Sequence, residues 1–286
     1  MILNLAYPSN SEIKFEISKF PDGQQTVTLI DFHPATLAYV PVEIKSRLNS
    51  FKDLELIICA NQALRNNGVK VVSLYVPYFS GARSDRQFST GGVNYLKQVI
   101  CPIINSQKFT KVTVVDPHSD VLEACLDSYA KVSNEKLVRF ALTKIDNKND
   151  AQKRTAFISP DAGALKKIYD LAKIFNVKNV TTASKVRDIQ TGNIVKTELP
   201  AMDLDGIEQF VIIDDICDGG RTFIELAKAI RLQTDKPIYL IVTHGIFSAG
   251  FDQLSTHFKG IFCTNSIDEI HETSKAGELV KQLNIF

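Results

Sequence analysis

The sequence contains no apolar run that approaches the roughly 18 residues needed to span a bilayer, so no transmembrane helix is expected. Its amino terminus also lacks the basic and apolar zones of a signal peptide, because Asn4, Pro8 and Ser9 interrupt the few apolar residues there. We therefore expect a cytoplasmic protein without a membrane partner.

An excess of charge of one sign is missing as well, and cysteine is scarce. Lys and Arg number 33 against 32 Asp and Glu, which gives a formal net charge of +1 and no argument for a nucleic-acid partner. The five cysteines are odd in number and widely spaced, mostly within apolar segments, so we interpret them as reduced core residues rather than zinc ligands or a disulfide framework. Hydrophobic residues make up 44% of the chain, enough for one large core or two ordinary ones.

Strand-like and helix-like segments alternate along the chain. Short β-rich runs occupy residues 70–77, 111–116, 155–159, 179–183, 209–214 and 238–243. Helical periodicity is found in residues 92–104, 163–175 and 222–232. This order predicts an α/β fold with parallel sheets.

Two polar segments stand out between these elements. Residues 144–154 are charged and polar, which is typical of a linker or a long surface loop. Residues 186–203 form a second polar stretch, with Lys185 and Arg187 at its start. It is interpreted as a mobile catalytic loop, with an ordinary surface hairpin as the alternative.

The most informative segment runs from residue 211 to residue 222. Its apolar start predicts a buried parallel strand that ends in the carboxylates Asp214 and Asp215. A helix is predicted directly after the turn from the spacing of Phe223, Leu226, Ala227 and Ile230. The glycine-containing turn, residues 218–222, therefore lies between a strand and the amino terminus of a helix.

Such a turn is suited to a ribose 5-phosphate group. The first backbone N–H groups of a helix have no internal partners and lie at the positive end of the helix dipole, so they can bind phosphate oxygens. Asp214 and Asp215 would then accept hydrogen bonds from two vicinal sugar hydroxyls. The structural alternative is that the carboxylates end the strand and that Asp218 is the N-cap of the helix.

This segment resembles the phosphoribosyl diphosphate (PRPP) binding motif shared by type I phosphoribosyltransferases and ribose-phosphate diphosphokinases. Further segments resemble diphosphokinase landmarks in family order, over nearly the whole chain. They are the early loop at 20–23, the ATP segment at 78–86, the metal-binding Asp-x-His at 116–118, the Ser-Pro-Asp-x-Gly turn at 158–163, the catalytic loop at 185–187, and later landmarks at 243–244 and 264–266.

The resemblance implies a fold of two similar type I phosphoribosyltransferase-like halves, each a mainly parallel sheet flanked by helices. Residues 1–140 would form the half with the ATP-binding segments, and residues 141–286 the half with the ribose-phosphate loop. No convincing internal repeat is visible in the sequence itself.

The resemblance also implies a magnesium-dependent transfer of the β,γ-diphosphoryl group of ATP to the anomeric hydroxyl of a ribose 5-phosphate moiety, with release of AMP. The implied ATP contacts are Phe20, Asp22, Gln24, Arg83, Ser84, Asp85 and His118. The implied magnesium ligands are Asp116, His118 and Asp161, and the implied catalytic residues are Lys185, Arg187 and His118. The implied ribose-phosphate contacts are Asp214, Asp215, Asp218, Gly219, Gly220, Arg221 and Thr222. Because the early loop of the family reaches the ATP of a neighbouring subunit, a homo-oligomer, dimer or hexamer, is expected.

The phosphate loop departs from the family pattern Asp-Thr-x-Gly-Thr. Gly219 replaces a Thr and Arg221 replaces a Gly, so a hydroxyl is lost and a five-donor guanidinium is gained. This change favours a diphosphate, and so an acceptor such as ADP-ribose, as in phage-encoded relatives. The alternative is that Arg221 points to solvent and the acceptor is free ribose 5-phosphate.

Other departures concern the ATP segments. Gln24 stands in place of a Glu, while Ser84 and Gln87 replace a Gln and a Lys. These changes put base selectivity and regulation in question more than the chemistry.

Two other functions remain open. A phosphoribosyltransferase using PRPP as donor would need only one α/β half and would leave Arg83 and Asp116 without a purpose. A non-catalytic regulatory paralogue would have no need of Lys185 and Arg187.

Overall fold

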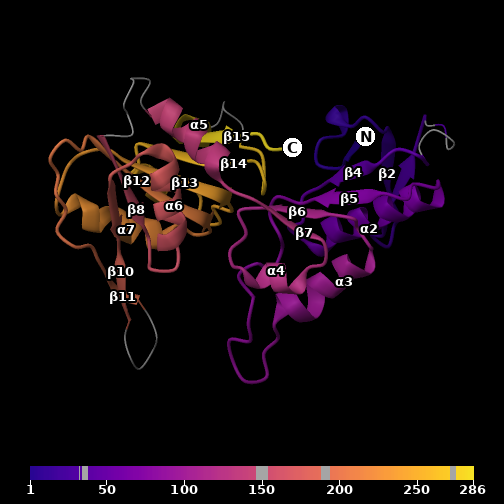
Figure 1. The fold of residues 1–286 in the computed structure, drawn as a ribbon, viewed down its shortest axis with the longest axis horizontal. Helices are drawn as coiled ribbons and strands as arrows, with labels where there is room; N and C mark the ends of the chain where they lie inside the picture. The colour runs from indigo at the N-terminus through magenta and orange to yellow at the C-terminus, as the bar shows by residue number, and fades with distance from the viewer. Residues whose placement is uncertain (32, 34–37, 146–153, 188–193, 271–274) are drawn as a thin grey trace. The chain divides into compact units, whose positions relative to one another are not determined.

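The computed structural model describes every residue except 32, 34–37, 146–153, 188–193 and 271–274, with the backbone alone for 185–187, 194–196 and 275–276. The chain divides into two compact units, Met1–Ser133 with Ile285–Phe286, and Asn134–Asn284 (Figure 1). No helix among the described residues combines the length and the apolar character that a membrane crossing requires.

The first unit contains a five-stranded parallel sheet in the order β1-β4-β5-β6-β7. Its strands are β1 (Ile2–Asn4), β4 (Val42–Lys45), β5 (Val72–Tyr75), β6 (Val112–Val115) and β7 (Tyr129–Val132). Its helices are η1 (Pro8–Asn10), α2 (Phe51–Asn66), η2 (Leu96–Ile100), α3 (Cys101–Ser106) and α4 (Val121–Cys125). An antiparallel hairpin, β2 (Phe15–Lys19) with β3 (Gln25–Leu29), completes the unit.

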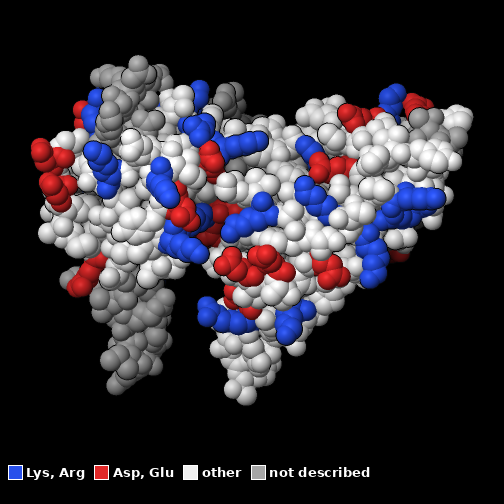
Figure 2. Space-filling view, viewed as in Figure 1, with Lys and Arg blue, Asp and Glu red and all other residues white. Residues whose placement is uncertain are grey.

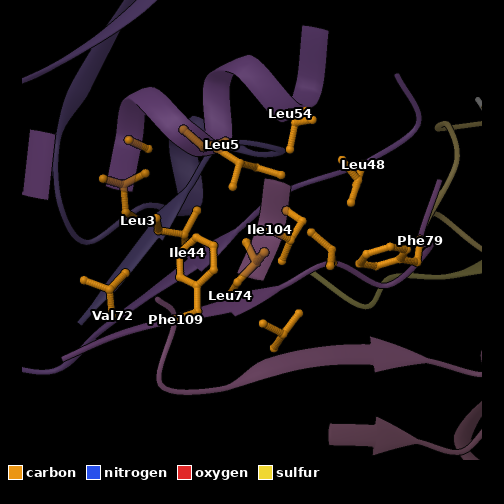
Figure 3. Packing of buried hydrophobic residues seen from close by; sticks show 14 of the residues in the cluster. Leu3, Leu5, Ile44, Leu48, Leu54, Val72, Leu74, Phe79, Ile104 and Phe109 are labelled. Atoms are coloured by element: carbon orange, nitrogen blue, oxygen red, sulfur yellow. The ribbon is translucent and has the colours of Figure 1, made fainter. Parts of the chain in front are cut away.

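The core of the first unit forms where α2 packs on its strands. Figure 3 shows Leu3, Ile44 and Leu74, from β1, β4 and β5, in one buried cluster with Leu54 of α2. Ser50 begins α2 with a capping box in which its hydroxyl accepts from the N–H of Asp53 and the Asp53 carboxylate accepts from the N–H of Ser50. The carboxyl end of β6, after which the predicted metal ligands Asp116 and His118 follow, belongs to this sheet.

The second unit contains a six-stranded parallel sheet in the order β15-β14-β13-β12-β8-β9. Its strands are β8 (Thr155–Ser159), β9 (Asn179–Thr182), β12 (Gln209–Cys217), β13 (Ile238–Gly245), β14 (Gly260–Thr264) and β15 (Val280–Leu283). Its helices are α5 (Glu135–Ile145), α6 (Leu165–Phe175), α7 (Arg221–Arg231), α8 (Asp252–Ser255) and α9 (Lys275–Leu279). β10 (Ser184–Arg187) and β11 (Ile194–Glu198) form a separate antiparallel ribbon.

Both faces of this second sheet are buried, which explains why β12 is a continuous apolar run. Ile212 packs in one cluster with the buried face of α7, while Val211 and Ile213 pack in another with residues of α5 and α6. The buried residues of α7 are Phe223, Leu226, Ala227 and Ile230, which confirms the predicted helical face. The predicted α/β fold with mainly parallel sheets is also confirmed.

Three boundaries differ from the sequence-based expectation. The segment 92–104 is split between η2 and α3. The polar stretch 186–203 contains strands in its described part, because β10 pairs with β11, so it is a hairpin rather than an open loop; residues 188–193 lie outside the described residues. The division between units follows Ser133 rather than residue 140, since Leu137, Val138, Ala141 and Leu142 of α5 pack into the second unit's core.

Surface charge is mixed among the described residues. On the face that Figure 2 shows, Lys and Arg side chains lie among Asp and Glu side chains, as the formal net charge of +1 leads one to expect. All five cysteines are free, and Cys101, Cys217 and Cys263 are buried. The interpretation of the cysteines as interior residues is confirmed for these three, while Cys59 and Cys125 are partly buried.

Candidate functional site

The two adjacent carboxylates lie within β12. Pairing of β12 with β13 continues through Ile216 and Cys217, so the strand passes its predicted end at Asp214. The prediction was wrong on this point because β13 supplies hydrogen-bond partners that the sequence pattern does not reveal. Asp214 and Asp215 therefore lie in the last part of the strand, where Asp214 is partly buried and Asp215 is only 8% exposed.

The turn after β12 depends on Gly220, the N-cap of α7. Its φ of +79° is in the left-handed region, and a Cβ there would lie 2.9 Å from Cδ2 of Leu254. The Gly220 carbonyl accepts hydrogen bonds from the N–H groups of Phe223 and Ile224, each at 3.0 Å. The N–H groups of residues 219–222 have no hydrogen-bond partner among the described residues, so the amino terminus of α7 is open to an anion.

Asp218 does not cap α7. Its Oδ1 accepts a hydrogen bond from Oγ of Ser248 at 2.6 Å, and no side chain caps the helix at Gly220. The structural alternative, in which Asp218 satisfies the first turn of the helix, is therefore wrong.

Burial and mutual proximity govern the charge of the carboxylate pair. Burial, then the charge of Asp215, then a side-chain hydrogen bond to Asp215 raise the pKa of Asp214 well above its usual value. The N–H of Asp215, which donates to Asp214 Oδ1 at 2.9 Å, and the ammonium of Lys167 on α6 act in the opposite direction. Burial, helped by the charges of Asp214 and Asp218, raises the pKa of the Cys217 thiol to about 12, so this cysteine stays protonated and is not a nucleophile.

A buried chain of hydroxyl groups fixes the ends of β13 and β14. Oγ1 of Thr264 donates to the Thr243 carbonyl at 2.6 Å, and Oγ of Ser266 lies 2.9 Å from Oγ1 of Thr264. Nδ1 of His244 lies within hydrogen-bond distance of Oγ of Ser266, at 2.8 Å. The landmarks at 243–244 and 264–266 therefore form one buried hydrogen-bonded network.

The predicted ATP segment of the first unit is a tight turn. Gly81 has a φ of +78°, and a Cβ there would lie 2.3 Å from the Tyr95 ring. The N–H of Ser84 donates to the Gly81 carbonyl at 2.8 Å. Arg83 is exposed, whereas Ser84 and Asp85 are partly buried, so the turn presents the Arg83 side chain outward.

The predicted metal ligands of the first unit follow β6. Asp116 is only 2% exposed and has a φ of +47°, with its N–H donating to the Val132 carbonyl of β7 at 2.8 Å. His118 is exposed. The Asp116 carboxylate suits a magnesium ion that keeps waters and substrate oxygens in its other positions, whereas the His118 imidazole is a less usual ligand for this metal. No group of three His, Cys, Asp or Glu is placed to hold a metal among the described residues.

The third predicted ligand, Asp161, lies in the second unit before α6. Its Oδ1 accepts from the N–H groups of Gly163 at 3.0 Å and Ala164 at 3.2 Å. These bonds give Asp161 a structural role at the start of α6.

Phe20, Asp22 and Gln24 lie at or beside the tip of the β2–β3 hairpin. The N–H of Phe20 donates to the Gln24 carbonyl at 2.8 Å, and the N–H of Gln24 donates to Oδ1 of Asp22 at 3.1 Å. The Phe20 side chain is 52% exposed, which is unusual for a large aromatic residue.

Lys185 and Arg187 lie in β10, where Lys185 pairs with Thr197 and Arg187 with Ile194. Their side chains lie outside the described part of the chain. Sequence reasoning placed both residues in a loop, and the structure instead pairs both backbones with β11, with a shift of register between Val186 and Arg187.

Two residues beside the carboxylates were not predicted from the sequence. Lys167 follows the Ser-Pro-Asp turn at the first turn of α6, and Ser248 follows the landmark at 243–244. Each of them lies four residues after a recognised landmark, and a polar residue that close to a landmark is the signal that could have pointed to it.

A pH-dependent stability follows from the raised pKa of Asp214. A carboxyl group whose pKa is higher in the folded than in the unfolded state stabilises the folded protein while it is protonated. This contribution to the free energy of unfolding is fully present below the unfolded pKa of about 3.9 and is lost as pH rises through the folded pKa. We expect Asp214→Asn, which cannot ionise, to become more stable relative to the native chain as pH rises from 4 to 8, by about 1.4 kcal/mol for each pKa unit. Urea denaturation across this range measures the effect, with Asp170→Asn, an exposed position on α6, as control. Parallel stability curves for Asp214→Asn and the native chain would contradict the electrostatic account.

Ribose-phosphate pyrophosphokinases are similar to this chain over most of its length. The relative from Sulfolobus acidocaldarius is 25% identical over 269 residues, which cover 92% of this chain and 87% of the relative. The relative from Bradyrhizobium diazoefficiens is 28% identical over 225 residues, covering 78% and 68%. Among solved structures, phosphoribosylpyrophosphate synthetase from Mycobacterium smegmatis matches with a TM-score of 0.79 at 16% identity, covering 97% of this chain and 88% of that one. At this identity the structural match shows a shared fold.

The family model described as phosphoribosyl transferase domain matches residues 128–271, half of the chain. This range contains the carboxylates of β12, the glycine turn and the open amino terminus of α7. The chain therefore belongs to the phosphoribosyl transferase domain family, and it is similar over most of its length to ribose-phosphate pyrophosphokinases.

Proposed function

We propose that the enzyme transfers the β,γ-diphosphoryl group of ATP to the anomeric hydroxyl of a ribose 5-phosphate moiety. The bond between Pβ and the α,β-bridging oxygen breaks, a bond from the anomeric oxygen to Pβ forms, AMP leaves, and the hydroxyl proton is released. The observation that carries this proposal is the open amino terminus of α7, which closely follows the partly buried Asp214 and the buried Asp215 of β12.

The second unit would bind the acceptor. The N–H groups of residues 219–222, helped by the Thr222 hydroxyl, would hold the 5-phosphate at the positive end of the α7 dipole. Asp214 and Asp215 would accept hydrogen bonds from the ribose hydroxyls, because a buried carboxylate needs such donors to offset its lost hydration. Binding would thus orient the anomeric hydroxyl before transfer, which lowers the barrier through positioning.

The first unit would bind ATP. Arg83 is exposed on its turn and would contact the phosphates, with Ser84, Asp85 and His118 near the nucleotide. In a homo-oligomer, dimer or hexamer, the exposed ring of Phe20 would stack on the adenine of a neighbouring subunit. Asp22 would accept from the adenine amino group there, and Gln24 would add a neutral contact.

Magnesium would be held by Asp116 with His118, and a second ion near Asp161. When bound, the metal neutralises phosphate charge and so eases displacement at phosphorus. Carboxylate oxygen is its usual protein ligand, and the buried Asp116 carboxylate is fixed by the strand end that carries it.

Lys185 and Arg187 would stabilise the charge that develops on the transferring group. We expect Lys185→Ala and Arg187→Ala each to lower turnover by about a hundredfold or more while changing the Michaelis constant for ATP far less. Lys196→Ala is the matched control, since Lys196 pairs with Val186 in the same ribbon. Steady-state AMP release measures all three variants, and full turnover in both Lys185→Ala and Arg187→Ala would remove the catalytic assignment.

We further propose ADP-ribose as the acceptor, with free ribose 5-phosphate as the alternative. Arg221 is exposed at the first position of α7, so its guanidinium could reach a second phosphate attached to the first. The space beside Gly219 supports this, because the atoms nearest to a Cβ placed there are Oγ of Ser248 at 3.8 Å and Cβ of Ala249 at 3.9 Å.

The acceptor is identified by AMP release from ATP and magnesium with ribose 5-phosphate, with ADP-ribose and with no acceptor. If Arg221 binds the second phosphate, Arg221→Gly should reduce use of ADP-ribose by about ten- to a hundredfold, the value of a charge-assisted hydrogen bond of about 1.5 to 3 kcal/mol. Use of ribose 5-phosphate should be spared. Adding Gly219→Thr should strengthen this shift, because it returns a hydroxyl to the turn. The larger side chain fits there, since a Cβ at that position meets its neighbours only at ordinary van der Waals distance.

The control for that experiment is Lys228→Ala, which removes another exposed cation of α7. Equal losses on both acceptors in Arg221→Gly would mean that Arg221 supports the turn. A native preference for ribose 5-phosphate would exclude ADP-ribose, and absence of AMP release with either acceptor would exclude the diphosphokinase reaction.

A further inference from the structure

The six residues Gly245–Gly250, here called the support segment, pack directly against the end of β12. The N–H groups of Ile246 and Phe247 both donate to the Cys217 carbonyl, at 2.8 and 3.2 Å. The support segment therefore begins beside the residue that precedes the phosphate turn, although the two are far apart in the sequence.

The backbone of the support segment is tightly specified. Phe247 has a φ of +48°, which is uncommon for a residue with a bulky side chain, and its ring centroid lies 4.8 Å from that of Phe251. A Cβ on Gly245 would lie 2.1 Å from the Phe247 ring, so only glycine fits there. The Phe247 carbonyl accepts from the N–H of Gly250 at 2.9 Å. These contacts fix the position of the next side chain, Ser248.

Ser248 holds the carboxylate of Asp218 through the 2.6 Å hydrogen bond between Oγ and Oδ1. Asp218 lies two residues before the N-cap, and aspartate at such a position readily accepts hydrogen bonds from backbone N–H groups two or three residues ahead. Those N–H groups belong to Gly220 and Arg221, and they are open in the structure. A carboxylate released from Ser248 could therefore compete with a phosphate for the same donors.

We propose that Ser248 is a positioning residue of the acceptor site: its hydroxyl keeps the Asp218 carboxylate away from the amino terminus of α7 and so leaves the N–H groups of residues 219–222 to a phosphate ester. This inference rests on the proposed function, in which those N–H groups bind the acceptor. The inference adds Ser248 to the acceptor site. This residue lies in the connection after β13, 30 residues from Asp218 in the chain.

Acceptor binding and protein stability should respond in opposite ways when the hydroxyl is removed. In Ser248→Ala the carboxylate can turn to the open N–H groups, so the dissociation constant for the acceptor should rise about tenfold. The helix gains a cap in the same variant, so the thermal unfolding temperature should stay the same or rise. A merely structural serine would instead lower the unfolding temperature together with binding.

Isothermal titration calorimetry with ribose 5-phosphate, and separately with ADP-ribose, tests the proposal on the full chain. Ser248→Thr restores a hydroxyl and should bind like the native chain. Ser255→Ala is the matched control, because the Ser255 hydroxyl is exposed and donates to the Asp252 carbonyl within α8; it should leave binding unchanged.

Each other result has a distinct meaning. Native affinity in Ser248→Ala would overturn the proposed role of Ser248 while leaving the proposed function intact. Weaker binding together with a lower unfolding temperature, or no recovery in Ser248→Thr, would also overturn it. A native chain that binds neither compound would remove the proposed function itself, and the role of Ser248 with it.

Discussion

The open amino terminus of α7 is the constraint on which the rest of the site depends. Gly220 takes a left-handed conformation and packs against Leu254, so the chain turns sharply before α7. The four N–H groups of residues 219–222 then have no hydrogen-bond partner among the described residues. Such groups are stabilised by an anion at the positive end of the helix dipole. The Asp218 carboxylate, which could have served, is held instead by Ser248. The N–H groups of the turn therefore stay open among the described residues.

Two adjacent carboxylates lie close to this helix terminus in the sequence and add acceptors for hydrogen bonds to the anion site. Asp214 and Asp215 share a poorly hydrated strand end, and Lys167 is a nearby cation that offsets part of their charge. A phosphorylated sugar presents both an anion and hydroxyl donors, which is the combination that an open helix terminus beside two carboxylates can satisfy. The similarity to ribose-phosphate pyrophosphokinases covers most of the chain and so is not confined to the second unit.

Elements with a strong local signal could be predicted from the sequence, and those defined by distant partners could not. The buried face of α7 could be predicted from the spacing of Phe223 and Leu226, because the apolar repeat that defines this face lies within the helix itself. The extension of β12 to Cys217 depends on pairing with β13, and the assignment of α5 to the second unit depends on a core built from five other elements, β8, α6, β12, β13 and β14. Ser248 was missed for the same reason, since its contact with Asp218 links two turns that only the parallel sheet brings together.

The most direct test of the open helix terminus is the backbone amide NMR spectrum of the full chain during titration with ribose 5-phosphate or ADP-ribose. The account predicts saturable shifts of the N–H signals of residues 219–222 at the same ligand concentration. The N–H signals of Gly163 and Ala164, which already donate to Asp161 at the start of α6, should shift little. Unchanged signals at residues 219–222 in a titration that saturates elsewhere would contradict the account.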